Sequence, residues 1–305
     1  MSMWKECEGL QEELVKIRRE LHQIPEFGFD LPETQKYVTD KLDELGIPYK
    51  CSGTDSSIIA EIKGGQPGKT VALRADMDAL KITEANDVDY KSKHEGLMHA
   101  CGHDNHITML LGAAKVLNAH KAEIKGNVRL LFQTAEELSK GAEIMIKDGA
   151  MDGVDAVFGQ HIGSIINKDI PAGKVIITPG CCMASFDRFV IRVKGTGCHG
   201  STPEKGTDPI TMASHIVINL QEIIAREVSA VKAAVVTIGY FHGGVAYNAI
   251  PSEVEIEGTI RALEEPMRQY LAKRIEEIAK STAATFRGTA EGEMDRGAPL
   301  VINND

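Results

Sequence analysis

The residues best suited to bind a metal ion are concentrated between His94 and His106, in the segment HEGLMHACGHDNH. Four histidines, one cysteine, one glutamate and one aspartate occur there within thirteen residues. Imidazole and thiolate groups bind zinc, manganese, cobalt or nickel, and the residue types alone do not select among these metals. A single histidine in such a loop is usually a local hydrogen-bonding residue, but so many ligand types in one loop favour a metal site.

The densest part of this segment is His99, Cys101 and His103, which occupy alternate positions. An extended backbone would turn all three side chains to the same side. The apolar residues that follow recur at helical spacing, so the segment is predicted to lead directly into a helix. Asp104 or Asn105 is then expected to cap the amino-terminal end of that helix.

Acidic and histidine side chains also follow three predicted strands. Strand 70–75 is followed by Asp76 and Asp78, strand 127–132 by Glu136 and Glu137, and strand 156–159 by His161. In an open α/β sheet the carboxyl ends of parallel strands lie along one edge, where ligands bind. Asp76 alone could equally be a turn residue. The neighbouring Glu136 and Glu137 favour a functional site more strongly, because adjacent carboxylates repel each other unless a cation or a shared proton relieves them.

Length and composition are those of an ordinary globular protein. The 305 residues are 43% hydrophobic and 26% charged, enough for a well-buried core and two domains. A net charge of −10 argues against nucleic acid or an anionic membrane as a partner, since both need a clustered positive surface. We expect no secretory signal and no membrane-spanning helix. The six scattered cysteines are typical of reduced thiols in the cytoplasm.

The order of predicted elements indicates two domains. Residues 1–182 contain the strands and helices of an α/β domain, with a mostly parallel sheet and helices on both faces. The composition changes near Pro179 and Gly180, and residues 183–295 follow the order βαββαβ, a ferredoxin-like α+β arrangement. In that second domain, Asp208 is expected to cap a helix that begins at Pro209. Residues 296–305 are expected to begin a return to the first domain.

Six motifs give the chain a specific resemblance to a known family. They are LRADMDAL, HACGHDNH, TAEE, GQHIG, GTGCHGSTPEKGTDPI and FHGGVAYNAIPSEVEIEGTIR. In this order they resemble metal-dependent amidohydrolases and metallopeptidases of family twenty, which includes aminoacylases, hippurate hydrolases, N-acetyldiaminopimelate deacetylases, auxin-conjugate hydrolases and thermostable carboxypeptidases. The likeness covers essentially the whole chain.

The resemblance implies a role for nine residues. Metal ligation is implied for Cys101, His103, Glu137 and His161, with two divalent ions of manganese, zinc, cobalt or nickel per subunit. Glu136 is implied as the general base and Asp78 as the carboxylate that orients the site. The second domain is implied to be an inserted lid, whose His199 helps hold the substrate carbonyl and whose Asn248 and Arg261 meet the substrate carboxylate.

The implied activity is hydrolysis of the amide bond of N-acyl amino acids or related small amides. In this reaction Glu136 would take a proton from metal-activated water and pass it to the leaving amine. The family also implies a homodimer formed through the lid. Its members usually continue past the position of Asp305 and supply one more histidine ligand there, so a truncated, inactive or binding-only homologue is an alternative. A second alternative is an amidase in which Cys101 is the nucleophile and His103 or His161 its base.

Overall fold

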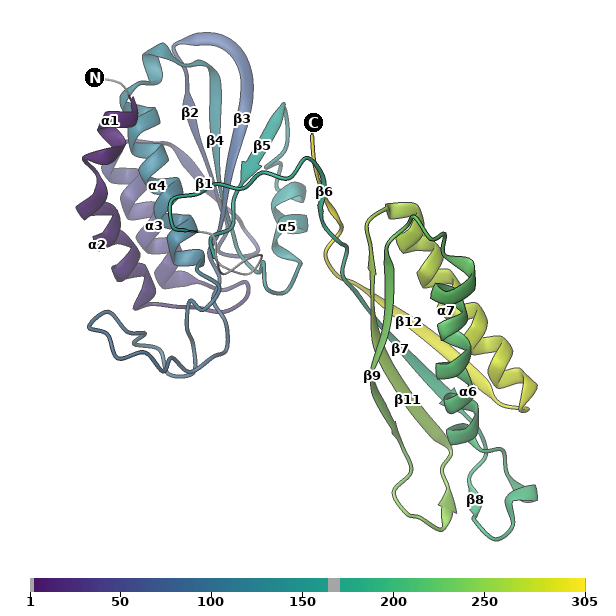
Figure 1. The fold of residues 1–305 in the computed structure, drawn as a ribbon. Helices are drawn as coiled ribbons and strands as arrows, with labels where there is room; N and C mark the ends of the chain where they lie inside the picture. Colours follow the sequence, from purple (N-terminus) through teal and green to yellow (C-terminus); the bar gives the residue numbers. More distant parts are fainter. Residues whose placement is uncertain (1–2, 164–170, 305) are drawn as a thin grey trace. The chain divides into compact units, whose positions relative to one another are not determined.

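A computed structural model describes residues 3–163 and 171–304 of the chain, which divides into two compact units (Figure 1). The first unit is Met1–Lys174 and the second is Val175–Asp305. The division predicted from the sequence lies a few residues later, after position 182. Within the described ranges, no helix is both long enough and apolar enough to span a membrane.

The first unit is built on a five-stranded sheet with the order β1-β2-β4-β3-β5. Its strands are β1 (Tyr49–Cys51), β2 (Ile58–Lys63), β3 (Gln66–Asp76), β4 (Lys125–Gln133) and β5 (Ala156–Gly159). The expected parallel pairing holds for β3 with β4 and for β3 with β5, whereas β1 and β2 run antiparallel, so the sheet is mixed. Only Gly64 and Gly65 join β2 to β3, which leaves no room for the long crossover that parallel strands need.

Helices cover both faces of this sheet (Figure 1). The larger layer contains α1 (Met3–Glu8), α2 (Gln11–His22), α3 (Pro32–Glu44) and α4 (His103–Ala119), and α5 (Gly141–Lys147) lies on the opposite face. The side chains of successive residues of β4 point to opposite faces of the sheet, because side chains alternate along a strand. Leu130 and Phe132 belong to the main core, whereas Leu131 packs in a smaller cluster with Met145 of α5.

Three parallel strands bring their carboxyl ends to the same edge of the sheet. Asp76 at the end of β3 pairs with Gln133 at the end of β4, and Arg74 pairs with Gly159 at the end of β5. The backbone N–H of Met77 donates to the carbonyl of Gln133, which continues the pairing past the strand end. The polar residues that follow each strand are therefore delivered to one place.

The second unit has the predicted order βαββαβ. Its elements are β7 (Asp187–Lys194), α6 (Pro209–Glu222), β9 (Ala234–Gly243), β11 (Glu253–Ala262), α7 (Glu265–Thr285) and β12 (Thr289–Arg296). The strands form an antiparallel sheet with the order β12-β7-β11-β9, and α6 and α7 pack against it. The predicted cap is confirmed, because the carboxylate of Asp208 accepts from the N–H of Ile210 at the start of α6.

Two short ladders in the second unit were not predicted from the sequence. One joins β6 (Gly180–Met183) to β13 (Val301–Asn303), and the other joins β8 (Cys198–His199) to β10 (Ala249–Ile250). Strands of two to four residues carry too few side chains for a hydrophobic period to be recognised.

A buried ion pair connects α7 to the start of β7. The Nε and Nη2 atoms of Arg268 donate to the two carboxylate oxygens of Asp187, at 2.7 and 2.6 Å. Asp187 is fully buried, and its carboxylate also accepts from the N–H of Gly297. Loss of the guanidinium would leave a buried carboxylate without its charge partner, which is far more costly than loss of an exposed pair.

We therefore expect Arg268→Met to lower the free energy of unfolding by about 3–5 kcal/mol. The control is Arg192→Met, because Arg192 is 42% exposed and pairs with Glu255 and Glu293 on the open face of the same sheet. That substitution should cost less than about 1 kcal/mol. Urea denaturation followed by circular dichroism measures both values, and equal losses would contradict the distinction.

Candidate metal centre

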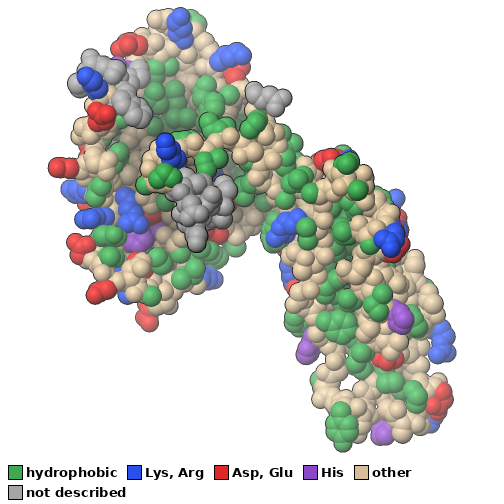
Figure 2. Space-filling model, in the orientation of Figure 1, with side chains coloured by type: hydrophobic (Ala, Val, Ile, Leu, Met, Phe, Trp, Pro, Cys, Tyr) green, Lys and Arg blue, Asp and Glu red, His purple; other side chains and the backbone are tan. Residues whose placement is uncertain are grey.

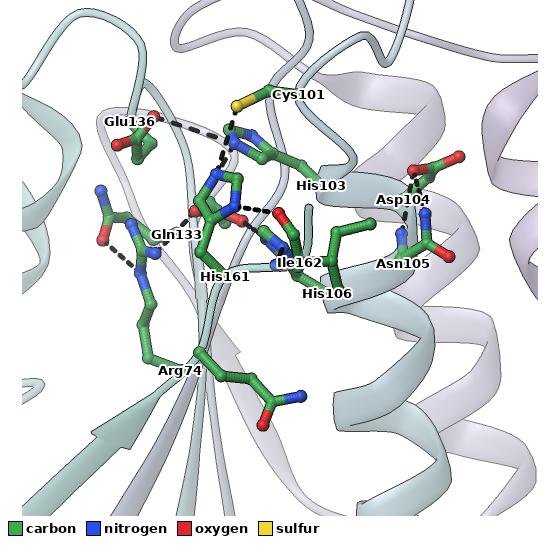
Figure 3. A network of polar contacts seen from close by, with 12 residues as sticks. Arg74, Cys101, His103, Asp104, Asn105, His106, Gln133, Glu136, His161 and Ile162 are labelled. Atoms are coloured by element: carbon green, nitrogen blue, oxygen red, sulfur yellow. Dashed lines mark hydrogen bonds and ion pairs between the residues drawn. The ribbon is translucent and has the colours of Figure 1, made fainter. Parts of the chain in front are cut away.

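Five of the candidate ligands converge where β3, β4 and β5 end. They are Cys101, His103, Glu136, Glu137 and His161. Figure 3 labels all of them except Glu137. The Nε2 atom of His103 lies 3.8 Å from a carboxylate oxygen of each glutamate. The Sγ atom of Cys101 lies 3.2 Å from Nε2 of His161. His103 belongs to each of three groups that could hold an ion, together with Cys101 and His161, with Glu136 and Glu137, or with Asp76 and His106. Within each group the ligand atoms lie within 4.8 Å of one another.

Asp78 fixes the positions of His103, Glu136 and Glu137 through hydrogen bonds. Its buried carboxylate accepts from the backbone N–H groups of Glu136 and Glu137, at 3.0 and 3.1 Å. Its backbone carbonyl accepts from Nδ1 of His103 at 2.7 Å. A carbonyl can only accept, so Nδ1 carries a proton, and in the neutral ring Nε2 is then the atom with the free lone pair.

The backbone before the two glutamates has an uncommon conformation. Ala135 has a φ of 48°, in the left-handed region that costs a residue with a Cβ about 1–2 kcal/mol. Its N–H donates to the carbonyl of Gly28, and the preceding Thr134 donates its hydroxyl to Asp55 at 2.6 Å. These hydrogen bonds offset the strain and turn Glu136 and Glu137 towards His103.

Two buried polar atoms at this centre have no hydrogen-bond partner among the described residues: Nε2 of His103 and Oε1 of Glu137. An unsatisfied buried polar atom costs about 1–3 kcal/mol, and more when the group is charged. A divalent cation would satisfy both atoms together. The surrounding thiolate, imidazole and carboxylate donors are the set that zinc and manganese accept, so the residues present fit such an ion.

The charges of the site shift the protonation of its ligands. Burial lowers the pKa of His103, but Asp78, Asp76 and Glu136 outweigh it and raise the pKa to about 9. Burial, reinforced by Glu137, raises the pKa of the Cys101 thiol to about 12. Burial and then Asp76 raise the pKa of Glu136 as well. Without a cation, His103 and Cys101 are therefore protonated at neutral pH.

The expected grouping of His99 with Cys101 and His103 is wrong. Gly102 has a φ of 90° and α4 begins at His103, so the backbone is not extended through this segment. His99 points instead into the interior, where it is 3% exposed, and burial lowers its pKa to about 4.

The expected helix cap in this segment is only partly correct. Gly102 takes the capping position of α4, but the carboxylate of Asp104 accepts from the N–H of Asn105 in the first turn, at 2.9 Å. Asp104 lies in the first turn of the helix, and its carboxylate interacts with His22 and Arg18 of α2.

Asp76 and His106 are two buried neighbours of the ligands for which the sequence predicted no specific role. Asp76 lies with a carboxylate oxygen 2.5 Å from Nδ1 of His106, and it also accepts from Arg74 at 2.6 Å. His106 lies in the first turn of α4. Its position three residues after His103 on one helix places the two rings side by side, with centroids 5.3 Å apart, and this spacing was the available signal.

The three candidate residues of the second unit do not form one group. His199 of β8 pairs with Ala249 of β10, which brings Asn248 close to it, and the carbonyl of Asn248 accepts from Gly200. Arg261 lies near the opposite end of β11, with its guanidinium 4.3 Å from the ring centre of Phe186. At a rise of about 3.3 Å per residue, most of the length of a ten-residue strand separates Arg261 from the other two.

Comparison with known proteins settles the family. The profile of peptidase family M20/M25/M40 matches residues 72–304. The chain belongs to this family. It is 40% identical over 297 residues to the N-acetyl-L-cysteine deacetylase of Bacillus subtilis, covering 97% of this chain and 70% of that protein. It is 41% identical over 294 residues to the N-acyl-L-amino acid amidohydrolase of Geobacillus stearothermophilus, covering 96% of this chain and 78% of the relative.

A solved structure supports the same assignment for this M20 chain. The crystal structure of a Bacillus subtilis protein described as a dinuclear metal binding peptidase from the M20 family superposes with a TM-score of 0.83. The two chains are 36% identical, and the match covers 97% of this chain and 77% of that one. Family and fold are thereby established, and the relatives are consistent with metal-dependent amide hydrolysis.

We expect metal binding to release protons and to strengthen as the pH rises. At pH 7 the pKa of His103, about 9, and that of Cys101, about 12, leave both groups protonated, and a ligand must lose its proton to bind. Calorimetric titration with Mn²⁺ or Zn²⁺ in buffers of different ionisation enthalpy should detect about two protons released at pH 7. Cys182→Ser, which alters an exposed thiol elsewhere, should leave that number unchanged. Affinity independent of pH would contradict the assignment.

Proposed function

We propose that this member of peptidase family M20/M25/M40 hydrolyses the amide bond of N-acyl amino acids or related small amides. The observation that carries the proposal is the pair of unsatisfied buried atoms on His103 and Glu137, with the carboxylate of Glu136 beside them. Metal-assisted hydrolysis needs two things: ligand atoms that a cation can occupy, and a carboxylate that can transfer a proton.

Cys101, His103, Glu137 and His161 would hold the ions, which we propose to be two divalent cations of manganese, zinc, cobalt or nickel. Bound there, they would acidify a water molecule and polarise the substrate carbonyl. Asp78 keeps Nε2 of His103 directed at the centre by fixing the opposite ring nitrogen. The same residue holds the backbone from which both glutamates project.

Glu136 is proposed as the general base. Its carboxylate oxygen lies 3.8 Å from Nε2 of His103, which is beside the ligands without being hydrogen-bonded to them. Burial raises its pKa, which makes it a better proton acceptor once ionised. It would accept the proton of water at Oε and return it to the nitrogen of the leaving amine, so activity should fall as the pH drops through its pKa.

The second unit is proposed to be a lid that supplies substrate contacts. His199 is exposed, with Nδ1 hydrogen-bonded to the Ser201 hydroxyl at 2.8 Å, which leaves Nε2 for the substrate carbonyl. Asn248 lies beside it through the β8–β10 ladder and would contact the substrate carboxylate. Arg261 lies towards the other end of β11. We therefore propose that Arg261 contacts the substrate bound to one subunit of the dimer, while His199 and Asn248 of the same chain contact the substrate bound to the other.

The raised pKa of Cys101 weakens the alternative of a cysteine nucleophile. Reactive cysteines have a lowered pKa next to cationic groups, and only the thiolate attacks. Here burial and the neighbouring carboxylates raise the pKa to about 12, which leaves almost no thiolate at neutral pH. The thiol is better suited to giving up its proton to a cation.

We expect Glu136→Gln to lower the turnover number about 10²–10⁴-fold and to leave metal binding intact, because the amide cannot accept a proton. The measurement is hydrolysis of N-acetyl, N-benzoyl and indole-acetyl amino acids with each of the four metals, together with metal content. Glu33→Gln, a change in an exposed carboxylate of α3, is the matched control.

The same assay separates the three candidate functions. Chelation should abolish turnover, and Mn²⁺ or Zn²⁺ should restore it. Turnover that resists chelation but is lost on thiol alkylation would instead support the cysteine mechanism. Metal binding without turnover of any substrate would identify a binding-only homologue, and full activity of Glu136→Gln would remove Glu136 from the mechanism.

A homodimer through the second unit is the proposed assembly. Strand β9 lies at the edge of its sheet and exposes Val235, Tyr240 and Phe241. On the neighbouring α6, Ile218 is 65% exposed. Figure 2 shows hydrophobic side chains on the visible surface of this unit. An open strand edge with apolar neighbours favours pairing with a second copy. Sedimentation should find a dimer that Ile218→Lys weakens, whereas a monomeric wild-type chain would contradict the proposal.

We also propose a reducing, cytoplasmic setting. All six cysteines are free thiols, including the adjacent Cys181 and Cys182, and free thiols persist in reducing compartments.

A further inference from the structure

The backbone of Ile162 links two histidines at the metal centre (Figure 3). Its N–H donates to Nε2 of His106 at 2.9 Å. Its carbonyl lies 2.5 Å from Nδ1 of His161. The rings of the two histidines are also in contact, at 74° to each other with centroids 4.7 Å apart. The two backbone groups of Ile162 thus connect His161, a proposed ligand, to His106, which is not among the proposed ligands.

These hydrogen bonds fix the proton positions on both rings. A backbone N–H can only donate, so Nε2 of His106 accepts, and its Nδ1 therefore carries the proton donated to Asp76. A carbonyl can only accept, so Nδ1 of His161 donates to Ile162. In the neutral ring this leaves Nε2 of His161 as the lone-pair atom, on the side of Cys101.

His106 is therefore not available as a ligand. Its Nε2 lone pair is used by the Ile162 N–H and its Nδ1 proton by Asp76, so neither nitrogen can bind a cation in this arrangement. Asp76 is in turn held by Arg74, whose Nε donates to Gln133 at the end of β4. The network extends from the strand ends to the peptide after His161.

His161 is the candidate ligand that most needs such support. It follows β5, an edge strand whose four residues are all exposed and, within the described part of the chain, pair with β3 alone. The side chain of Ile162 also lies against Gly102, because a Cβ at Gly102 would lie 2.7 Å from Cδ1 of Ile162. The strand alone would leave the position of His161 loosely determined.

We propose that His106, oriented by Asp76, is a positioning residue that holds His161 in its metal-binding orientation through the backbone N–H and carbonyl of Ile162. This rests on the proposed metal centre. His106 acts without touching the ion or the substrate. Partners of this kind that orient ligands commonly change metal affinity 10–100-fold when removed.

Two substitutions separate positioning from simple packing. Glutamine places an acceptor near the position of Nε2, so His106→Gln can keep the hydrogen bond from Ile162. Asparagine reaches only as far as Nδ1, so His106→Asn can keep the bond to Asp76 and loses the one to Ile162. We expect His106→Asn and His106→Ala to weaken one of two Co²⁺ sites about 10–100-fold, whereas His106→Gln binds nearly as the wild type does.

The measurement is titration of the full chain with Co²⁺, followed by calorimetry and by the visible absorption of cobalt, which reports ligand geometry. Thermal melts of the metal-free variants show whether each is folded. The control is His120→Gln, which changes a histidine after the last turn of the same helix, bonded to Glu6 and Glu123. It should leave both sites and the spectrum unchanged.

The outcomes distinguish this inference from the proposed function. If the wild type binds two Co²⁺ ions and the asparagine and alanine variants bind them equally well, positioning by His106 is wrong and the metal centre stands. If the glutamine variant loses as much affinity as the asparagine variant, the bond to Ile162 is not the cause and the inference fails. If the wild type binds no ion, the metal centre fails and the inference with it. If the alanine variant does not fold, the glutamine and asparagine pair decides.

Discussion

The organisation of the first unit depends on the electrostatic free energy that it costs to place several carboxylates close together where water has little access. Asp76, Asp78, Glu136 and Glu137 approach one another at the edge of the sheet, and the imidazole of His103 lies between them. Carboxylates this close repel each other unless positive charge compensates them. Arg74 compensates Asp76, and two backbone N–H groups satisfy Asp78. Among the described residues, His103 lies 3.8 Å from both Glu136 and Glu137, and a bound cation would compensate the charge that remains.

Each strand end contributes residues with a different role at this site. The end of β3 supplies carboxylates that orient other residues, because Asp76 hydrogen-bonds to His106 and Asp78 accepts from the backbone of the glutamates. The end of β4 leads into the strained Ala135, after which both glutamates face the centre. The end of β5 supplies His161, and α4 begins with His103. Ligands and their supports thus come from separate elements that meet only in the folded chain.

Much of this could be predicted from the sequence, because apolar runs and chain order carry the information. The run before Asp76, the run before Gln133 and the helix that follows His103 are all found where the sequence predicts them. The βαββαβ order of the second unit was equally visible. The sequence alone did not predict that β1 and β2 run antiparallel, since hydrophobicity within a strand does not record its direction.

The remaining errors have a common physical origin. The alternation of His99, Cys101 and His103 predicted a shared side only for an extended backbone, and Gly102 breaks that geometry. The role of His106 depends on the N–H of Ile162, and a backbone group has no sequence signature. Arg268 and Asp187 are 81 residues apart, so their buried pairing could not be seen as a local pattern. Prediction failed where function or stability depends on backbone groups and distant partners.

The most direct measurement of the central claim is anomalous X-ray scattering from crystals of the chain grown with Zn²⁺ or Mn²⁺. The account predicts two anomalous peaks at the edge of the first-unit sheet, within bonding distance of Cys101, His103, Glu137 and His161. Metal–ligand distances should be about 2.0–2.3 Å for zinc. Peaks located away from these four side chains, or no peak at all in metal-saturated crystals, would contradict it.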